Sequence, residues 1–270
     1  MKEGAAALGL PGVGSRSALP RALLAILAVF VVWEVAARVF APADYLVVPW
    51  PTALLKAMSD QSDTLLTAIQ PSALEALLGL LLGASAACVL AFIFTRFPVM
   101  ESALANVAVT VNALPWLAIA PLLTIWFGVE LAPKVIVAAL ATFFPVLVNT
   151  TRGLKSADPH VLEFLYVIDA NEWQTFVRVR LVSSLPHFFA GLKIAAPQAV
   201  LGATVAEWMG SRAGIGAQIL SALLNYDVLL LWSAMIASAL LAALFFAVAL
   251  IAEHLVVGRW AEPAGEEDDR

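Results

Sequence analysis

Residues 158–186 read DPHVLEFLYVIDANEWQTFVRVRLVSSLP and form a polar insert between the fourth and fifth apolar stretches of the chain. Asp158 followed by Pro159 predicts a helix start, because Asp caps unpaired backbone N–H groups and Pro has no N–H to leave unpaired. A short helix to about Ile168 is expected, then a turn, then a second short helix capped by Asn171 with Gln174 completing a capping box. Two short helices that face water must bury their apolar faces against the chain's own membrane domain or a second protein. The insert therefore has the build of a docking element.

The rest of the chain is too apolar for a soluble protein. Of its 270 residues, 62% are hydrophobic and 13% are charged, and the mean hydropathy is +0.91. A soluble domain is about half apolar and a quarter charged. Because so few charges cannot cover a water-facing surface, the composition predicts an integral membrane protein. The net charge of −5 reflects mainly an acidic tail, residues 259–270, which we interpret as solvated.

Six apolar stretches are long enough to cross a bilayer, which takes roughly 20 helical residues each. They cover residues 21–40, 70–94, 101–127, 132–150, 187–208 and 228–255. The first is read as an uncleaved helix rather than a signal peptide, because its apolar run is long and the next span follows closely. The third contains Pro115 and Pro121, so a kink or break is expected there, with the freed backbone groups lining an interior. The predicted fold is an all-α protein of six transmembrane helices over residues 21–258, with a tail at 1–20.

Lysine and arginine are distributed unevenly between the two sides that these spans define. With a cytoplasmic N-terminus, one side collects eleven of them: Lys2, Arg16, Arg21, Arg96, Arg152, Lys155, Arg178, Arg180, Lys193, Arg259 and Arg270. The other side collects four: Arg38, Lys56, Lys134 and Arg212. This bias predicts cytoplasmic termini, a cytoplasmic loop at about 155–186 and an external loop at about 41–69.

The sequence carries no sign of an enzymatic site. The glycine-rich stretch 210–216 lacks the lysine of a phosphate-binding loop and is read as an external loop. The three histidines are scattered without ligand spacing, and the single Cys88 lies in an apolar run, so no metal site and no cofactor are expected. No nucleophile, base and acid are placed together by a local motif, and no basic patch indicates nucleic acid.

Several motifs, taken in order, resemble one transporter family. Glu163, Asp169 and Leu185-Pro186 resemble the E-A-A-x-x-x-G-x(n)-L-P loop of binding-protein-dependent ATP-binding-cassette (ABC) importer permeases. Residues 170–176 (ANEWQTF) look like the stretch that follows the motif glycine, and 191–195 (GLKIA) and Glu207-Trp208 fit the fifth span. Residues 114–128 fit the nitrate/sulfonate/taurine and riboflavin/pyrimidine branches. The resemblance covers about residues 20–258.

The insert also departs from the family pattern at three positions. The two small residues after the motif glutamate are Phe164 and Leu165 here, and the motif glycine is Asp169. A glycine at that turn suggests a positive φ, which Asp tolerates better than most residues, so the turn is expected to survive. The bulky pair enlarges the docking face, so a partner's groove must be roomy or apolar.

The resemblance implies a type I permease fold, a homodimer or pseudo-symmetric pair of this subunit, two separate ATPase subunits that bind the ATP, and an extracytoplasmic solute-binding protein. It implies that the insert is a coupling helix that transmits movement of the ATPase to the spans. The residues assigned to this role are Glu163, Phe164, Leu165, Asp169, Ala170, Trp173, Leu185 and Pro186. Glu163 is expected to pair with Arg178 or Arg180, while Phe164 and Leu165 pack either beneath the spans or against the partner.

Polar and small residues within the spans are the candidates for other roles. Glu207, Asn112 and Gln198 are candidate pathway or gate residues. Glu34 is expected to form an interhelical hydrogen bond or to lie at the membrane interface, and Glu75 is expected to extend to the outer interface. A stripe of small residues is suited to close helix packing, within the chain or at a dimer seam. It consists of Gly79, Gly83 and Ala87.

The sequence favours an aromatic vitamin precursor as the solute, riboflavin or a thiamine-precursor pyrimidine, with sulfonate, nitrate or taurine next. This rests on the resemblance of residues 169–170 and 207–211 to such permeases. The alternative function is an ATP-independent secondary transporter or channel, which would show inverted repeats or an intramembrane relay of acids and histidines.

Overall fold

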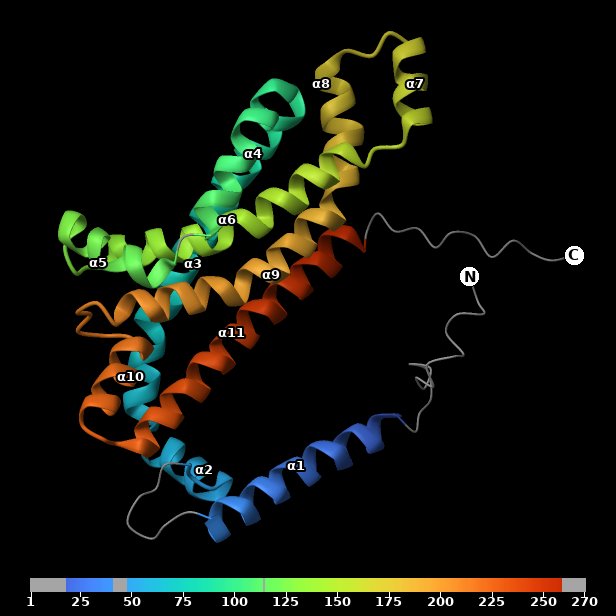
Figure 1. Cartoon of the computed structure of the whole chain (residues 1–270). Helices are drawn as coiled ribbons and strands as arrows, with labels where there is room; N and C mark the ends of the chain where they lie inside the picture. The colour runs from blue at the N-terminus through green and yellow to red at the C-terminus, as the bar shows by residue number, and fades with distance from the viewer. Residues whose placement is uncertain (1–17, 41–47, 114, 259–270) are drawn as a thin grey trace, which may run out of the picture.

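The computed structural model describes residues 18–40, 48–113 and 115–258, and every regular element in this part of the chain is a helix (Figure 1). The elements are α1 (Ala18–Phe40), α2 (Pro51–Asp60), α3 (Ser62–Arg96), α4 (Pro98–Ala113), α5 (Trp116–Phe127), α6 (Leu131–Lys155), α7 (Pro159–Val167), α8 (Glu172–Thr175), the π-helix η2 (Phe176–Arg180), α9 (Leu181–Glu207), α10 (Ile215–Leu224) and α11 (Val228–Val257). In Figure 1, α7 and α8 lie at one end of the bundle, and α2 and α10 lie at the other.

Helix α6 is the centre of the bundle and packs most extensively against α9 and α3. Glycines allow this approach, because a Cβ on Gly83 of α3 would collide with Thr142 and with the carbonyl of Ala139 on α6. Helix α9 approaches α6 in the same way, because a Cβ on Gly202 of α9 would lie 3.0 Å from the Cα of Ala138. The predicted close packing is confirmed for Gly83, and the contact lies within the chain, so this position is not available as a dimer seam.

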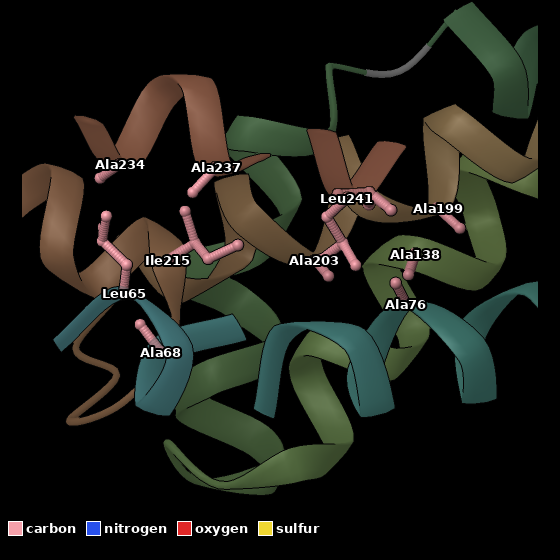
Figure 2. Close-up of a cluster of buried hydrophobic side chains, with 11 residues drawn as sticks. Leu65, Ala68, Ala76, Ala138, Ala199, Ala203, Ile215, Ala234, Ala237 and Leu241 are labelled. Carbon is pink, nitrogen blue, oxygen red and sulfur yellow. The ribbon is translucent and has the colours of Figure 1, made fainter. Parts of the chain in front are cut away.

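Alanine dominates the main buried cluster, in which α3, α6, α9, α10 and α11 meet (Figure 2). The cluster includes Leu65, Ala68, Ala76, Ala138, Ala199, Val200, Ala203, Ile215, Ala234, Ala237 and Leu241. Small side chains bring helix backbones together and gain van der Waals contact, which is the main attraction between helices surrounded by lipid.

Helices cover all six predicted spans. Within the described residues, four helices are long and apolar enough to cross a membrane: 62–96, 131–155, 172–207 and 228–257. The first predicted span is α1, and the third is divided into α4 and α5. Pro115 precedes α5 and forms its N-cap in an extended conformation, so the predicted break is confirmed.

Two predicted loops are wrong in part. Residues 41–69 were expected to be an external loop, but α2 begins at Pro51 and α3 already begins at Ser62. The residues around Asp60 are polar and were therefore left outside the predicted span, but a helix can continue into water beyond its apolar part. Residues 210–216 were likewise expected to be a loop, and α10 begins at Ile215. The predicted tails at 1–20 and 259–270 lie outside the described residues, apart from the first turn of α1.

Helix α1 touches the other helices at one end. The Trp33 ring lies 6.0 Å from the Trp232 ring of α11. Glu34 accepts hydrogen bonds from the backbone N–H of Thr52 at 3.0 Å and from its hydroxyl at 2.8 Å, so the predicted interhelical bond is confirmed. Most of the large apolar side chains of α1 are exposed, as expected for a helix that faces lipid.

We predict that Gly83→Ala destabilises the chain by about 1–3 kcal/mol, because α3 and α6 must separate to admit the methyl group. This overcomes the gain of about 1 kcal/mol in helix propensity. The control is Ala86→Val, an exposed position on the same helix. Thermal unfolding in detergent measures both variants, and equal midpoints for G83A and the wild type would contradict the packing argument.

Candidate functional site

The polar insert folds as its caps predict. The Asp158 carboxylate accepts a hydrogen bond from the N–H of His160 at 2.8 Å, and Pro159 begins α7. Asn171 accepts from the N–H of Gln174 at 2.8 Å, and Gln174 accepts from the N–H of Asn171 at 3.2 Å. The predicted helix start and capping box are therefore both confirmed. Asp158 fixes the start of α7, and the capping box fixes the start of α8.

Asp169 occupies the position where the family motif has glycine, and its φ is 56°. The N–H of Asp169 donates to the carbonyl of Tyr166 at 3.1 Å, and the N–H of Ala170 donates to the carbonyl of Leu165 at 3.0 Å. This pair of bonds is a Schellman motif, which needs a left-handed residue after the helix. The expectation that Asp preserves the turn is confirmed.

Helix α7 projects from the bundle and has no buried residue (Figure 1). Phe164 is 62% exposed, Leu165 is half-buried and Glu163 is exposed. Within the described residues Glu163 forms no ion pair, so the predicted partners Arg178 and Arg180 are wrong. Glu163 lies at an exposed position on α7.

The sequence led us to expect a separate second short helix, and this expectation is wrong. Helix α8 continues through η2 into α9, so residues 172–207 form one continuous helical segment. Leu185 and Pro186 were placed at the end of the insert and instead lie inside α9. The sequence showed a proline where a loop was expected to end, but membrane helices accommodate prolines, and α9 contains two.

Trp173 and Phe176 connect α8 to the end of α3. Trp173 is 67% exposed, and its ring lies 6.0 Å from the ring of Phe176. Phe176 in turn contacts Phe92 of α3 edge to face, with ring centroids 4.8 Å apart. The base of the insert is therefore anchored on a transmembrane helix, while α7 is not.

A second group of polar residues lies buried at the opposite end of the bundle. Glu75 of α3 is 2% exposed and accepts a hydrogen bond from Lys134 of α6, with Nζ to Oε1 at 2.9 Å. The expectation that Glu75 extends to the outer interface is wrong, because the side of α3 that carries it faces α6. A buried carboxylate is stabilised only with a partner, and Lys134 supplies it.

Glu207 at the end of α9 is fully buried. Its carboxylate accepts from the Ser72 hydroxyl at 2.5 Å and from the N–H of Gly216 at 2.5 Å, and the N–H of Ile215 donates to the Ser72 hydroxyl at 2.8 Å. Glu207 thereby satisfies the N-terminus of α10, where a negative charge is favourable.

Two of the three candidate pathway residues, Gln198 and Glu207, lie nine residues apart on α9. Glu207 is buried among protein partners, so solute cannot contact its carboxylate in this conformation. Gln198 is half-buried on α9, and Asn112 belongs to α4 but its side chain lies outside the described residues. Their assignment to a pathway or gate remains a prediction. The sequence analysis missed Ser72 and Lys134 as partners of the buried acids.

The chain matches the family described as "Binding-protein-dependent transport system inner membrane component" over residues 77–262. It is 36% identical over 194 residues to the formylaminopyrimidine transport permease protein ThiX of Halalkalibacterium halodurans, covering 72% of this chain and 77% of the relative. It is 38% identical over 161 residues to the riboflavin transport system permease protein RibX of Chloroflexus aurantiacus, covering 60% of each. It is 32% identical over 178 residues to the putative aliphatic sulfonates transport permease protein SsuC of Bacillus subtilis, covering 65% of this chain and 64% of the relative.

We predict that Lys134→Met costs about 3–5 kcal/mol of stability, because it leaves the Glu75 carboxylate buried without its cation. The double variant K134M/E75L should recover most of the loss. Lys56→Met, at an exposed position on α2, is the control. Thermal unfolding in detergent checks the series, and a double variant no more stable than K134M would show that the pair is not coupled.

A separate prediction concerns the turn after α7. Asp169→Gly should keep it, whereas Asp169→Val should weaken it by about 1–2 kcal/mol, because a side chain with a branched Cβ fits the left-handed conformation poorly. Hydrogen exchange of the Ala170 amide, which donates to Leu165, reports on the turn. Equal exchange in D169G and D169V would contradict this account.

Proposed function

Because the chain belongs to the family of binding-protein-dependent transport system inner membrane components and is the membrane-spanning permease subunit of an ABC importer, we propose that α7 is the element through which separate ATPase subunits drive it. The chain forms the solute pathway and is a transport subunit, without a catalytic site of its own. ATP is bound by the partner subunits, and this chain needs no cofactor.

One observation carries the proposal: α7 is an ordered helix with exposed apolar side chains and no extensive contact with another described helix. Val161, Phe164 and Ile168 are 41%, 62% and 55% exposed and share one face at helical spacing. Exposed clusters of large apolar side chains mark interaction surfaces, and aromatic side chains often anchor them. Phe164 is the proposed anchor in a cleft of the ATPase.

The caps on both sides of α7 support a mechanical role. A lever must move as a unit, and the Asp158 cap, the Schellman turn at Asp169 and the Asn171 capping box leave few backbone groups free to rearrange. Beyond the turn, α8 leads through the π-helix η2 into α9 as one helical segment. A displacement of α7 by the ATPase would therefore act directly on a transmembrane helix.

The proposed orientation places α7 and both termini on the cytoplasmic side. The end of the bundle that carries α7 also carries Arg96, Arg152, Lys155, Arg178 and Arg180, which agrees with the positive-inside rule. The end with α2 and α10 then faces outward, where the solute-binding protein docks. A second copy of this chain completes the pathway as a homodimer.

The proposed solute is an aromatic vitamin precursor, riboflavin or a thiamine-precursor pyrimidine. This is supported by two relatives, of which one is named as a formylaminopyrimidine transport permease and the other as a riboflavin transport permease. A relative for aliphatic sulfonates makes sulfonate, nitrate or taurine the next candidates. The relatives give no support to an ATP-independent transporter or channel, and the buried acids are bonded within the protein rather than lined up across it.

We predict that Phe164→Asp abolishes co-purification of the partner ATPase, because a charge replaces the proposed buried anchor. The ATPase activity that riboflavin-loaded binding protein stimulates should fall at least tenfold. Replacing Glu163, Phe164 and Leu165 together by Asp should do the same. Membrane insertion should be unchanged, since α7 makes no extensive contact with another described helix.

The control is Tyr226→Asp, which introduces the same charge at a 90% exposed position at the other end of the bundle. It should leave ATPase binding intact. If the ATPase stays bound to F164D with unchanged stimulation, α7 is not the docking element.

A further inference from the structure

A pocket of about 690 Å³ lies between the end of α3, helix α7 and the α8–η2 segment. Phe92, Thr95 and Arg96 line it from the last turns of α3, and Phe176 and Arg180 line it from η2. Both helical segments are among those long enough to cross the membrane. The pocket therefore lies where two spans end, at the depth of the lipid headgroups.

The pocket carries more positive than negative charge. Arg96 and Arg180 line it together with one acid, Glu172. Arg96 is paired with Glu172 at 2.8 Å, but their side chains are 55% and 80% exposed, and such a pair contributes little. Arg180 donates to the carbonyl of Leu154 at 3.4 Å. Because a guanidinium has five N–H donors in a fork that matches phosphate, both arginines retain capacity for an anion.

The wall beside the arginines is aromatic. Phe92 is 39% exposed and contacts Phe176, which stacks on Trp173. Val89 lies three residues before Phe92 on the same side of α3 and is 61% exposed. An apolar surface thus continues from the pocket along α3 toward the bilayer interior, as an acyl chain attached to the headgroup would require.

Helix α7 separates this pocket from the proposed ATPase surface. Leu162 and Tyr166 line the pocket and lie one turn apart. Phe164 and Ile168 point to the opposite side of the helix, because a residue two positions away is rotated by about 200° in a helix of 3.6 residues per turn. The pocket can therefore be occupied whether or not α7 docks an ATPase.

We propose that this pocket binds an anionic phospholipid from the leaflet on the α7 side. Its phosphate lies between Arg96 and Arg180, and an acyl chain follows Phe92 and Val89. Basic residues at the end of a span attract anionic lipid, and each contributes about a fivefold gain in binding. A bound lipid ties the end of α3 to the base of the insert.

The test is the thermal stability of the full-length chain in detergent, titrated with phosphatidylglycerol or phosphatidylcholine. Phosphatidylglycerol should raise the midpoint at concentrations about 25-fold lower than phosphatidylcholine, since two arginines act together. Arg96→Gln with Arg180→Gln should abolish this preference, whereas R96K/R180K should retain most of it. Arg212→Gln, at an exposed position in the loop between α9 and α10, is the matched control and should leave the preference unchanged.

Glu172→Gln distinguishes binding from structural damage, because it breaks the same ion pair as R96Q but leaves both arginines for the lipid. It should strengthen the preference for phosphatidylglycerol, and a loss would overturn the proposal. Equal stabilisation of the wild type by both lipids would also overturn it. So would an equal effect of glycerol phosphate, which would indicate a site for a free anion. Binding that appears only after the acids of residues 262–269 are neutralised would assign the pocket to the acidic tail instead.

Discussion

At Gly83 and Gly202 the backbones of α3 and α9 lie directly against α6, close enough that a Cβ at either glycine would meet α6 atoms. Lipid offers no hydrophobic force to hold apolar helices together, so contact area between backbones and small side chains has to do so. Ala138 takes part in both contacts, since a Cβ on Gly79 would collide with its methyl group and a Cβ on Gly202 would touch its Cα. The alanines of Figure 2 extend this close packing to α11, and Ile215 extends it to α10.

The tight α3–α6–α9 unit explains how the bundle can hold buried charges. Glu75 and Glu207 are carboxylates removed from water, which is costly unless partners are fixed in place. Lys134 comes from α6, Ser72 from α3 and the N–H of Gly216 from α10, so four helices must keep their relative positions for the acids to stay satisfied. Gly214 and Gly216 add to this, because a Cβ at either would collide with the Glu207 side chain. In this conformation both acids are therefore bonded to partners within the protein at one end of the bundle.

The sequence predicted the spans, the break at Pro115 and the caps of the insert, because these depend on local chemistry within a few residues. It failed where distant contacts decide. Glu75 was misread, although it lies on the same helical stripe as Ser72, Gly79 and Gly83, and a stripe that packs against another helix also buries its polar members. The partner Lys134 lies 59 residues away, and no local pattern predicts that pairing. The predicted pairing of Glu163 with an arginine was also wrong. The residues are close in sequence, but Glu163 lies on a helix that projects from the bundle.

The continuity of α8, η2 and α9 connects the two ends of the molecule. Residues 172–207 are 36 residues long, which corresponds to about 54 Å of helix. One end begins at the Asn171 capping box beside α7, and the other ends at Glu207, which holds α3 and α10. Between them, η2, Pro186 and Pro197 interrupt the regular hydrogen bonding of the helix, and such points are where helices bend. A displacement of α7 would therefore reach the buried acids as a tilt or bend of α9. During such a movement Ser72 and Gly216 must either move together with Glu207 or lose their hydrogen bonds to it.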